Sequence, residues 1–219
     1  MAAWRLCPEA GCTVFYGILN IAHQIRSGGS VMDGLPLVVD LDGTLTYGDT
    51  GLRSLWAFAR RNALALPLSL WWQLHGRARV KQELARRWNF RADEQPYISE
   101  TVEFLRSERE AGRRLILCTG STRMVAEKIA SFLGIFEDVL GTEGETNLIG
   151  EAKAGRLVSI FGEKGFDYAG NSMQDLRVWR HARRAIVVNA PAKVLLAAEK
   201  IAEIERIILT EDVREGRHG

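Results

Sequence analysis

Two carboxylates separated by a single residue are the part of this sequence best suited to chemistry. Asp40 and Asp42 directly follow the apolar run Leu35–Val39, in the segment Asp40-Leu41-Asp42-Gly43-Thr44-Leu45-Thr46. Side chains at positions i and i+2 of a strand point to the same side, so the two can form an anionic site for a hard cation with oxygen ligands. Gly43 allows the sharp turn by which the backbone leaves the strand. The segment therefore predicts a functional site.

Three later segments place polar residues beside predicted strands or at the start of a helix. Thr119 ends the apolar run Leu115–Cys118, and Lys153 opens a helical stretch after Gly150-Glu151-Ala152. The segment Gly170-Asn171-Ser172-Met173-Gln174-Asp175 follows the run Phe166–Ala169. Each of these segments alone is a weak signal, but all four in this order form a strong one.

Taken in order, the four segments resemble the motifs of the haloacid dehalogenase superfamily, over roughly residues 34–192. The resemblance implies a phosphatase in which Asp40 attacks phosphorus and forms an aspartyl-phosphate. Asp42 would protonate the leaving oxygen and then deprotonate the hydrolytic water. Its presence favours a phosphatase over a dehalogenase, because a departing halide needs no acid. Thr119 and Lys153 would bind the phosphoryl oxygens.

The resemblance also implies a binding site for Mg²⁺ and for a small phosphorylated substrate. The metal would be held by Asp40, the backbone carbonyl of Asp42, Asn171 and, indirectly, Asp175. The expected substrate-binding residues are Gly43, Thr44, Gly120 and Asp49. For Asp49, stabilisation of a turn is an equally good interpretation.

Asn171 departs from the usual pattern of the superfamily, in which most relatives carry a carboxylate metal ligand at this position. An amide oxygen still coordinates Mg²⁺ but supplies no charge, so we expect weaker metal binding. A chain that binds without catalysis stays an open alternative.

A narrower resemblance concerns the segments Phe166–Ser172, Asp175–Trp179 and Ala185–Asn189. They are similar to the hydrolase domain found N-terminal to UbiA-type prenyltransferases, in which asparagine is usual at the position of Asn171. This resemblance implies a prenyl-linked phosphosugar or similar phosphorylated metabolite as substrate. It also leaves open a weakly catalytic or non-catalytic module that docks to a membrane prenyltransferase, and a chain that is a fragment of a longer fusion.

Five short apolar runs bounded by turn residues predict buried strands. They are Leu35–Asp40, Arg114–Thr119, Asp138–Thr142, Phe166–Gly170 and Ala185–Asn189. Helical patterns lie between the later runs, at Thr122–Leu133, Lys153–Phe161 and Asp175–Arg183. This alternation predicts an α/β protein with a Rossmann-like three-layer fold and a parallel sheet.

Residues 50–110 contain no strand candidate and predict a small helical cap inserted after the first strand. Helical patterns occur at Arg53–Asn62, Leu64–His75 and Arg79–Trp88, and Ser99–Ala111 leads back to the sheet. An insertion at the carboxyl end of a strand lies above the place where open α/β sheets bind ligands. The cap is therefore expected to cover the site.

The predicted domain occupies residues 32–205, with its core at 34–49 and 112–192. Residues 1–31 end in Ser27-Gly28-Gly29-Ser30 and predict a weakly ordered extension, and residues 206–219 predict a C-terminal tail.

The charge balance, the apolar stretches and the cysteines of the chain indicate which partners and which cellular compartment to expect. The 29 basic and 27 acidic residues give a net charge of +2, which does not favour nucleic acid as a partner. No stretch approaches the roughly 20 apolar residues that span a bilayer. The three cysteines form no disulfide or zinc pattern, which fits a reducing compartment. We expect a cytoplasmic protein, with association at the inner face of the membrane left open.

Overall fold

The computed structural model describes residues 34–50, 53, 90–143 and 147–210. The predicted N-terminal extension, residues 211–219 of the predicted tail and nearly all of the three helical stretches predicted for the cap lie outside these residues.

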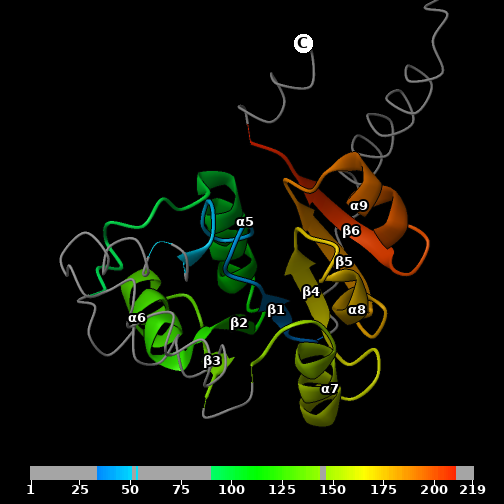
Figure 1. Ribbon diagram of the computed structural model, residues 1–219, viewed down its shortest axis with the longest axis horizontal. Coiled ribbons are helices and arrows are strands. Elements are labelled where there is room, and N and C mark those ends of the chain that lie inside the picture. Colours follow the sequence, from blue (N-terminus) through cyan, green and yellow to red (C-terminus); the bar gives the residue numbers. More distant parts are fainter. Residues whose placement is uncertain (1–33, 51–52, 54–89, 144–146, 211–219) are drawn as a thin grey trace, which may run out of the picture.

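Six parallel strands form the central sheet, in the order β3-β2-β1-β4-β5-β6 (Figure 1). Their bounds are Leu37–Val39 for β1, Leu115–Thr122 for β2, Asp138–Thr142 for β3, Asp167–Gly170 for β4, Arg184–Val188 for β5 and Glu203–Ile208 for β6. The first five correspond to the five predicted strands. The predicted α/β fold with a parallel sheet is confirmed.

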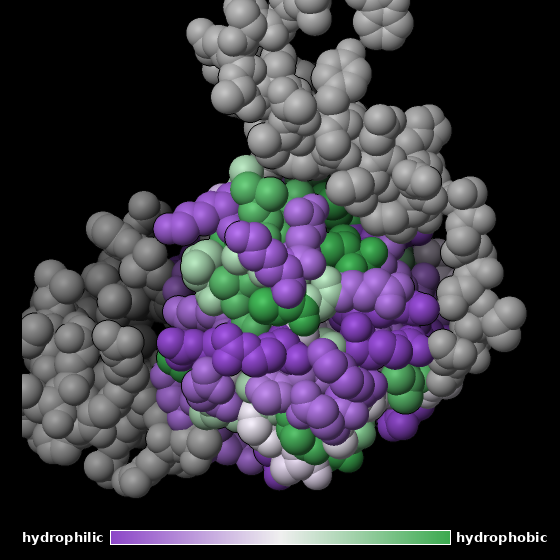
Figure 2. All heavy atoms as spheres, turned by 90° about the vertical axis from the view of Figure 1, so that its right-hand side faces the viewer, coloured by the Kyte–Doolittle hydropathy of each residue, from purple (hydrophilic) through white to green (hydrophobic). Residues whose placement is uncertain are grey.

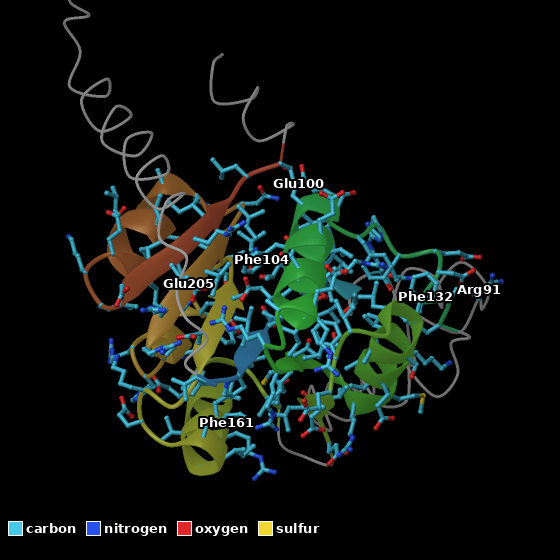
Figure 3. The ribbon with its side chains drawn as sticks, turned by 180° about the vertical axis from the view of Figure 1, so that it is seen from behind. Arg91, Glu100, Phe104, Phe132, Phe161 and Glu205 are labelled. Atoms are coloured by element: carbon cyan, nitrogen blue, oxygen red, sulfur yellow. The ribbon has the colours of Figure 1, made fainter. Side chains whose placement is uncertain are left out.

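The sixth strand was missed, and it corrects the predicted start of the tail at residue 206. β6 pairs in parallel with β5 and runs to Ile208. Its sequence Glu-Ile-Glu-Arg-Ile-Ile carries three charged residues, as an edge strand can, and so lacks the continuous apolar run of a central strand. The guanidinium of Arg206 packs over the ring of Phe104 at 4.6 Å. Phe104 lies on the helix α5, Ser99–Glu110 (Figure 3).

Helices cover both faces of the sheet, which gives three layers (Figure 1). Leu37 and Val39 of β1 belong to the core shared with α5 (Ser99–Glu110) and α6 (Arg123–Leu133). The intervening Val38 belongs to the opposite core, shared with α7 (Gly150–Phe161), α8 (Leu176–Trp179) and α9 (Ala192–Ala198). A parallel strand buried on both faces is apolar throughout, as the short run of β1 is.

Helix α5 corrects the predicted extent of the cap. Phe104 and Leu105 are buried with the strand residues Leu115 and Leu117. The helix is therefore part of the three-layer core, so Ser99–Glu110 does not belong to the cap predicted for residues 50–110.

Helices α6 and α7 agree with the predicted helical patterns, α8 is shorter than its pattern, and α9 was not predicted. Helix α6 ends at Leu133, and the φ of 65° at Gly134 is the left-handed conformation that commonly terminates a helix. Helix α8 ends at Trp179, because the chain after it is tied to the loop that precedes β4. The N–H of Lys164 donates to the His181 carbonyl, and the N–H of Arg183 donates to the Phe166 carbonyl.

The outer surface of the α8, α9 and β6 side is largely hydrophilic with apolar patches between the charged residues (Figure 2). None of the helices in the described part of the chain is long and apolar enough to cross a membrane.

A buried carboxylate joins the strands at the amino end of the sheet, away from Asp40. Asp167, which is fully buried, pairs with the guanidinium groups of Arg113 and Arg183 and accepts the backbone N–H of Arg184 at 2.9 Å. Arg113 also contacts Glu205 of β6 at 2.8 Å. One carboxylate thus links β4, the start of β5 and, through Arg113, the edge strand.

We predict that Asp167→Ala lowers the free energy of unfolding by about 3–5 kcal/mol, because it removes the buried carboxylate that two partly buried guanidinium groups share. Chemical denaturation of the variant measures this. Asp93→Ala is the matched control, since Asp93 pairs with Arg91 in an exposed ion pair that should leave stability nearly unchanged. Equal stability of the two variants would contradict the structural role of Asp167.

Candidate active site

The predicted site residues meet at the carboxyl edge of the sheet, where β1 and β4 lie side by side. The chain adds β2 and β3 on one side of β1 and β4 to β6 on the other, so this junction is the topological switch point at which open α/β sheets bind ligands. Asp40 follows the last residue of β1, and Asn171 follows the last residue of β4.

Asp40 forms a buried ion pair with Lys153. The Lys153 ammonium donates to Asp40 Oδ1 at 2.7 Å, and the side chains are 5% and 12% exposed. Burial raises the pKa of Asp40 to about 7, against the lowering effect of the lysine charge. Burial alone would lower the pKa of Lys153, but the negative charge of Asp40 raises it above its usual value. The lysine is therefore a fixed positive charge next to a poorly hydrated carboxylate.

Asp42 is held by two hydroxyl groups and one backbone amide. Asp42 Oδ1 accepts hydrogen bonds from the N–H and the hydroxyl of Thr50, both at 2.7 Å. Asp42 Oδ2 accepts the hydroxyl of Ser121 at 3.3 Å, and the oxygens of Ser121 and Thr50 lie 2.6 Å apart. Burial raises the pKa of Asp42, and the two hydrogen bonds from Thr50 oppose this. The carboxyl group can thus hold a proton more readily than an exposed aspartate.

Asn171 packs directly on the turn that follows Asp42. A Cβ atom at Gly43 would lie 2.1 Å from Asn171 Nδ2, and Gly43 has a φ of 78°. Both the close contact and the left-handed backbone therefore require glycine at this position. The hydroxyl of Thr44 approaches Asn171 Oδ1 at 3.5 Å. The structure therefore brings Gly43, Thr44 and Asn171 together, as the sequence predicted.

Asp175 organises the loop that carries Asn171. Asp175 Oδ2 accepts hydrogen bonds from the backbone N–H groups of Asn171 at 3.1 Å and Ser172 at 2.9 Å, and from the Ser172 hydroxyl at 2.7 Å. Asp175 Oδ1 accepts the hydroxyl of Tyr168 at 2.8 Å. Both carboxylate oxygens of Asp175 thus hold the start of the loop next to β4.

Thr119 and Gly120 lie where the pairing of β2 with β3 shifts register, between Cys118 and Thr122. The Thr119 side chain is fully buried, and its hydroxyl oxygen accepts the N–H of Ser121 at 3.0 Å. A Cβ atom at Gly120 would lie 2.4 Å from Ile149 Cγ2, just before α7. Gly120 thus allows the Lys153 helix to approach β2, a packing reason that the sequence did not reveal.

Asp49 is exposed on the turn before Thr50. Its charge is near enough to raise the pKa of Asp42. The structure therefore places Asp49 near Asp42, and its predicted role in substrate binding stays a prediction.

Three residues that contact the predicted groups were not found from the sequence: Thr50, Ser121 and Tyr168. Thr50 and Ser121 give no local signal in the sequence, because only the fold brings their hydroxyl groups to Asp42. Tyr168 gave a signal that could have been used, because a tyrosine in a buried strand requires a hydrogen-bond partner for its hydroxyl group.

The residues at this edge offer Mg²⁺ both charged and neutral oxygen ligands. No group of three His, Cys, Asp or Glu side chains suited to a metal occurs in the described ranges. The available set is the Asp40 carboxylate, the Asp42 carbonyl and the Asn171 amide, and Mg²⁺ often combines one or two carboxylates with water and substrate phosphate. The close contact of Asn171 with Gly43 places the amide on the turn that follows Asp42.

Comparison with known proteins identifies the family. The sequence model of haloacid dehalogenase-like hydrolases matches residues 37–180, and the chain belongs to this family. The chain is 34% identical over 161 residues to the uncharacterized protein y4nM of Sinorhizobium fredii, a match that covers 73% of this chain and 31% of that protein. The chain thus spans about a third of the length of this curated relative.

Solved structures show the same fold at low sequence identity. A protein of unknown function from Bordetella pertussis Tohama I has a TM-score of 0.57 and 17% identity, and the match covers 79% of this chain and 97% of that one. A phosphoserine phosphatase in the apo form has a TM-score of 0.53 and 14% identity, covering 85% and 98%. A structure from Lactobacillus delbrueckii that is named as a phosphoglycolate phosphatase has a TM-score of 0.52 and 16% identity. The match covers 84% of this chain and 98% of that one.

The hydrogen bonds to Asp42 predict how its protonation responds to mutation. Thr50→Val removes a hydroxyl group that stabilises the ionised carboxylate, so the pKa of Asp42 should rise by up to about one unit, equivalent to ~1.4 kcal/mol. The measurement is a pH titration of the Asp42 carboxyl ¹³C chemical shift in metal-free protein. Thr101→Val is the control, because the buried Thr101 hydroxyl has no hydrogen-bond partner among the described residues. An unchanged or lower pKa in Thr50→Val would refute this account.

Proposed function

We propose that this protein is a Mg²⁺-dependent phosphatase that hydrolyses a phosphate monoester through an aspartyl-phosphate on Asp40. The supporting observation is the buried contact of 2.7 Å between Asp40 and Lys153 at the switch point of the sheet. A carboxylate that has lost most of its water is a better nucleophile than a hydrated one, and the adjacent ammonium can bind the phosphoryl group it attacks.

The first step forms a bond between an Asp40 oxygen and phosphorus and breaks the bond to the leaving oxygen. Asp42, whose pKa burial raises, gives its proton to that oxygen. In the second step Asp42 takes a proton from water, whose oxygen attacks phosphorus and releases Asp40 and inorganic phosphate. A general acid that then acts as the base needs a carboxyl group with a raised pKa in a protected position. The bonds from Thr50 and Ser121 hold Asp42 in one orientation for both steps.

The remaining predicted residues bind the phosphoryl group and the metal. Lys153 and Thr119 would hold the phosphoryl oxygens, and Gly43, Thr44, Gly120 and Asp49 would line the substrate position. Asp40, the Asp42 carbonyl and Asn171 would hold Mg²⁺, with Asp175 fixing the loop of Asn171. The ion, when bound, reduces the repulsion between the carboxylate and the phosphate.

The substrate class rests on chemistry and on the named structural neighbours. Phosphoserine and phosphoglycolate are the phosphate monoesters in the names of two of the neighbours. A prenyl-linked phosphosugar and a UbiA-type prenyltransferase partner stay proposals, since neither the family nor the relatives named above refer to such an enzyme. The greater length of y4nM favours a role of this domain alongside another one. The buried free thiol of Cys118 is in keeping with the cytoplasm.

The nucleophile is tested by Asp40→Asn. We expect the rate of Mg²⁺-dependent phosphate release to fall at least about a thousandfold, or ~4 kcal/mol in the barrier, because an amide cannot form the aspartyl-phosphate. A screen of phosphorylated metabolites, prenyl-linked phosphosugars included, supplies the substrate. Asp93→Asn makes the same chemical change at an exposed site and should keep full activity. Asp40 would be excluded as the nucleophile if Asp40→Asn kept more than about a tenth of the activity, which is an increase of less than ~1.4 kcal/mol in the barrier. A wild type inactive on the whole screen would favour the docking module.

The metal ligand is tested by Asn171→Asp. An added carboxylate should lower the Mg²⁺ concentration at half-saturation by about tenfold, or ~1.4 kcal/mol. Calorimetric titration with Mg²⁺ measures this without turnover. Gln174→Glu adds the same charge at an exposed position of the same loop, and its midpoint should change less than about twofold because Gln174 lies outside the ligand set. Equal shifts in both variants would show that charge near the loop, not ligation by residue 171, sets the affinity.

A further inference from the structure

Tyr168 places a hydroxyl group between the two halves of the site. The residue lies in β4 and is fully buried. Its oxygen accepts a hydrogen bond from the Lys153 ammonium at 3.0 Å, and its proton is donated to Asp175 Oδ1 at 2.8 Å. The hydroxyl group thus has one cationic donor and one anionic acceptor, both of them buried.

The two hydrogen-bond partners of Tyr168, Lys153 and Asp175, contact different parts of the site. Lys153 contacts Asp40 at 2.7 Å. Asp175 binds the backbone N–H groups of Asn171 and Ser172. A continuous series of hydrogen bonds therefore runs from the carboxylate Asp40, through Lys153, Tyr168 and Asp175, to the loop of Asn171.

The tyrosine ring is held in place by packing, so its hydroxyl group is a fixed reference point. The ring meets Trp179 edge to face, with centroids 6.4 Å apart, and the Trp179 indole N–H donates to the Tyr168 carbonyl at 2.9 Å. A Cβ atom at Gly170 would lie 2.9 Å from Tyr168 Cε1. The glycine that precedes Asn171 thus also leaves room for this ring.

We propose that the Tyr168 hydroxyl group is a positioning group that couples Lys153 to the loop of Asn171, and this inference rests on the proposed phosphatase function. An ammonium group has three N–H donors. In the described part of the chain Asp40 and Tyr168 take two of them, which directs the third to a phosphoryl oxygen. Without the hydroxyl group, Lys153 can turn away from that direction, and Asp175 loses one of the bonds that hold the loop.

The experiment uses inorganic phosphate and Mg²⁺ as probes and compares four full-length proteins: wild type, Tyr168→Phe, Lys153→Met and the double variant. Calorimetry gives the affinity for phosphate at saturating Mg²⁺ and for Mg²⁺ alone. Tyr168→Phe keeps the ring and removes only the hydroxyl group. A group that acts through Lys153 should have little effect once the lysine is gone.

We expect Tyr168→Phe to weaken phosphate binding by about tenfold in the wild-type background and by less than about twofold in the Lys153→Met background. We also expect the Mg²⁺ midpoint to rise by about threefold or more, through the loop of Asn171. Tyr97→Phe is the matched control, because it also removes a tyrosine hydroxyl group, one that donates to the Ala92 carbonyl at 2.8 Å. It should leave both affinities unchanged.

Equal losses of phosphate affinity in the two backgrounds would overturn the proposal, because the Tyr168 hydroxyl group would then act independently of Lys153. Wild-type affinities in Tyr168→Phe would overturn it as well. If Tyr168→Phe does not fold, 3,5-difluorotyrosine at position 168 replaces it. The more acidic phenol is a poorer acceptor for Lys153, so phosphate affinity should fall in the wild-type background only, and an unchanged affinity overturns the proposal.

The same measurements separate this inference from the proposed function. A wild type that binds Mg²⁺ and phosphate but hydrolyses no phosphate monoester refutes the function, while the comparison of variants still decides the role of Tyr168. A wild type that binds no phosphate overturns both.

Discussion

A carboxylate removed from water at the end of a buried strand needs a compensating charge, and Lys153 supplies it for Asp40. The cost of burying either group alone is several kcal/mol, and a contact of 2.7 Å between them offsets much of it. The pair constrains the architecture, because Lys153 must reach β1 from the first turns of α7. Gly120 allows this approach by leaving room for Ile149 next to β2.

The same constraint explains why the polar groups of the site are arranged as connected networks. Two further carboxyl groups at this edge have several donors each: Asp42 has Thr50 and Ser121, and Asp175 has Tyr168, Ser172 and backbone amides. Buried polar groups without partners are costly, so a site that concentrates three aspartates must also recruit hydroxyl groups. At the opposite end of the sheet, arginines meet the same need for Asp167.

The sequence allowed the aspartates and the first five strands to be predicted because those signals are local. Asp40 and Asp42 follow a short apolar run, and parallel strands bring their carboxyl ends to one edge. β6 was missed because its charged residues are satisfied by tertiary contacts, such as Arg206 on Phe104. The extent of the cap was overestimated because a helix that packs on the sheet and one that covers a site have the same periodicity.

Contacts between side chains distant in the sequence could not be predicted in this way. Ser121 is 79 residues from Asp42, and Lys153 is 113 residues from Asp40. Only the pattern of a known family indicated that the second pair would meet, and no such pattern indicated the first. The contacts of the Tyr168 hydroxyl group could not be predicted either. Strand β4 fixes the position of the ring, but the fold supplies both charged partners of the hydroxyl group, Lys153 and Asp175. Residues that tune a site are therefore harder to find from sequence than residues that perform its chemistry, because their identity depends on what the fold places next to them.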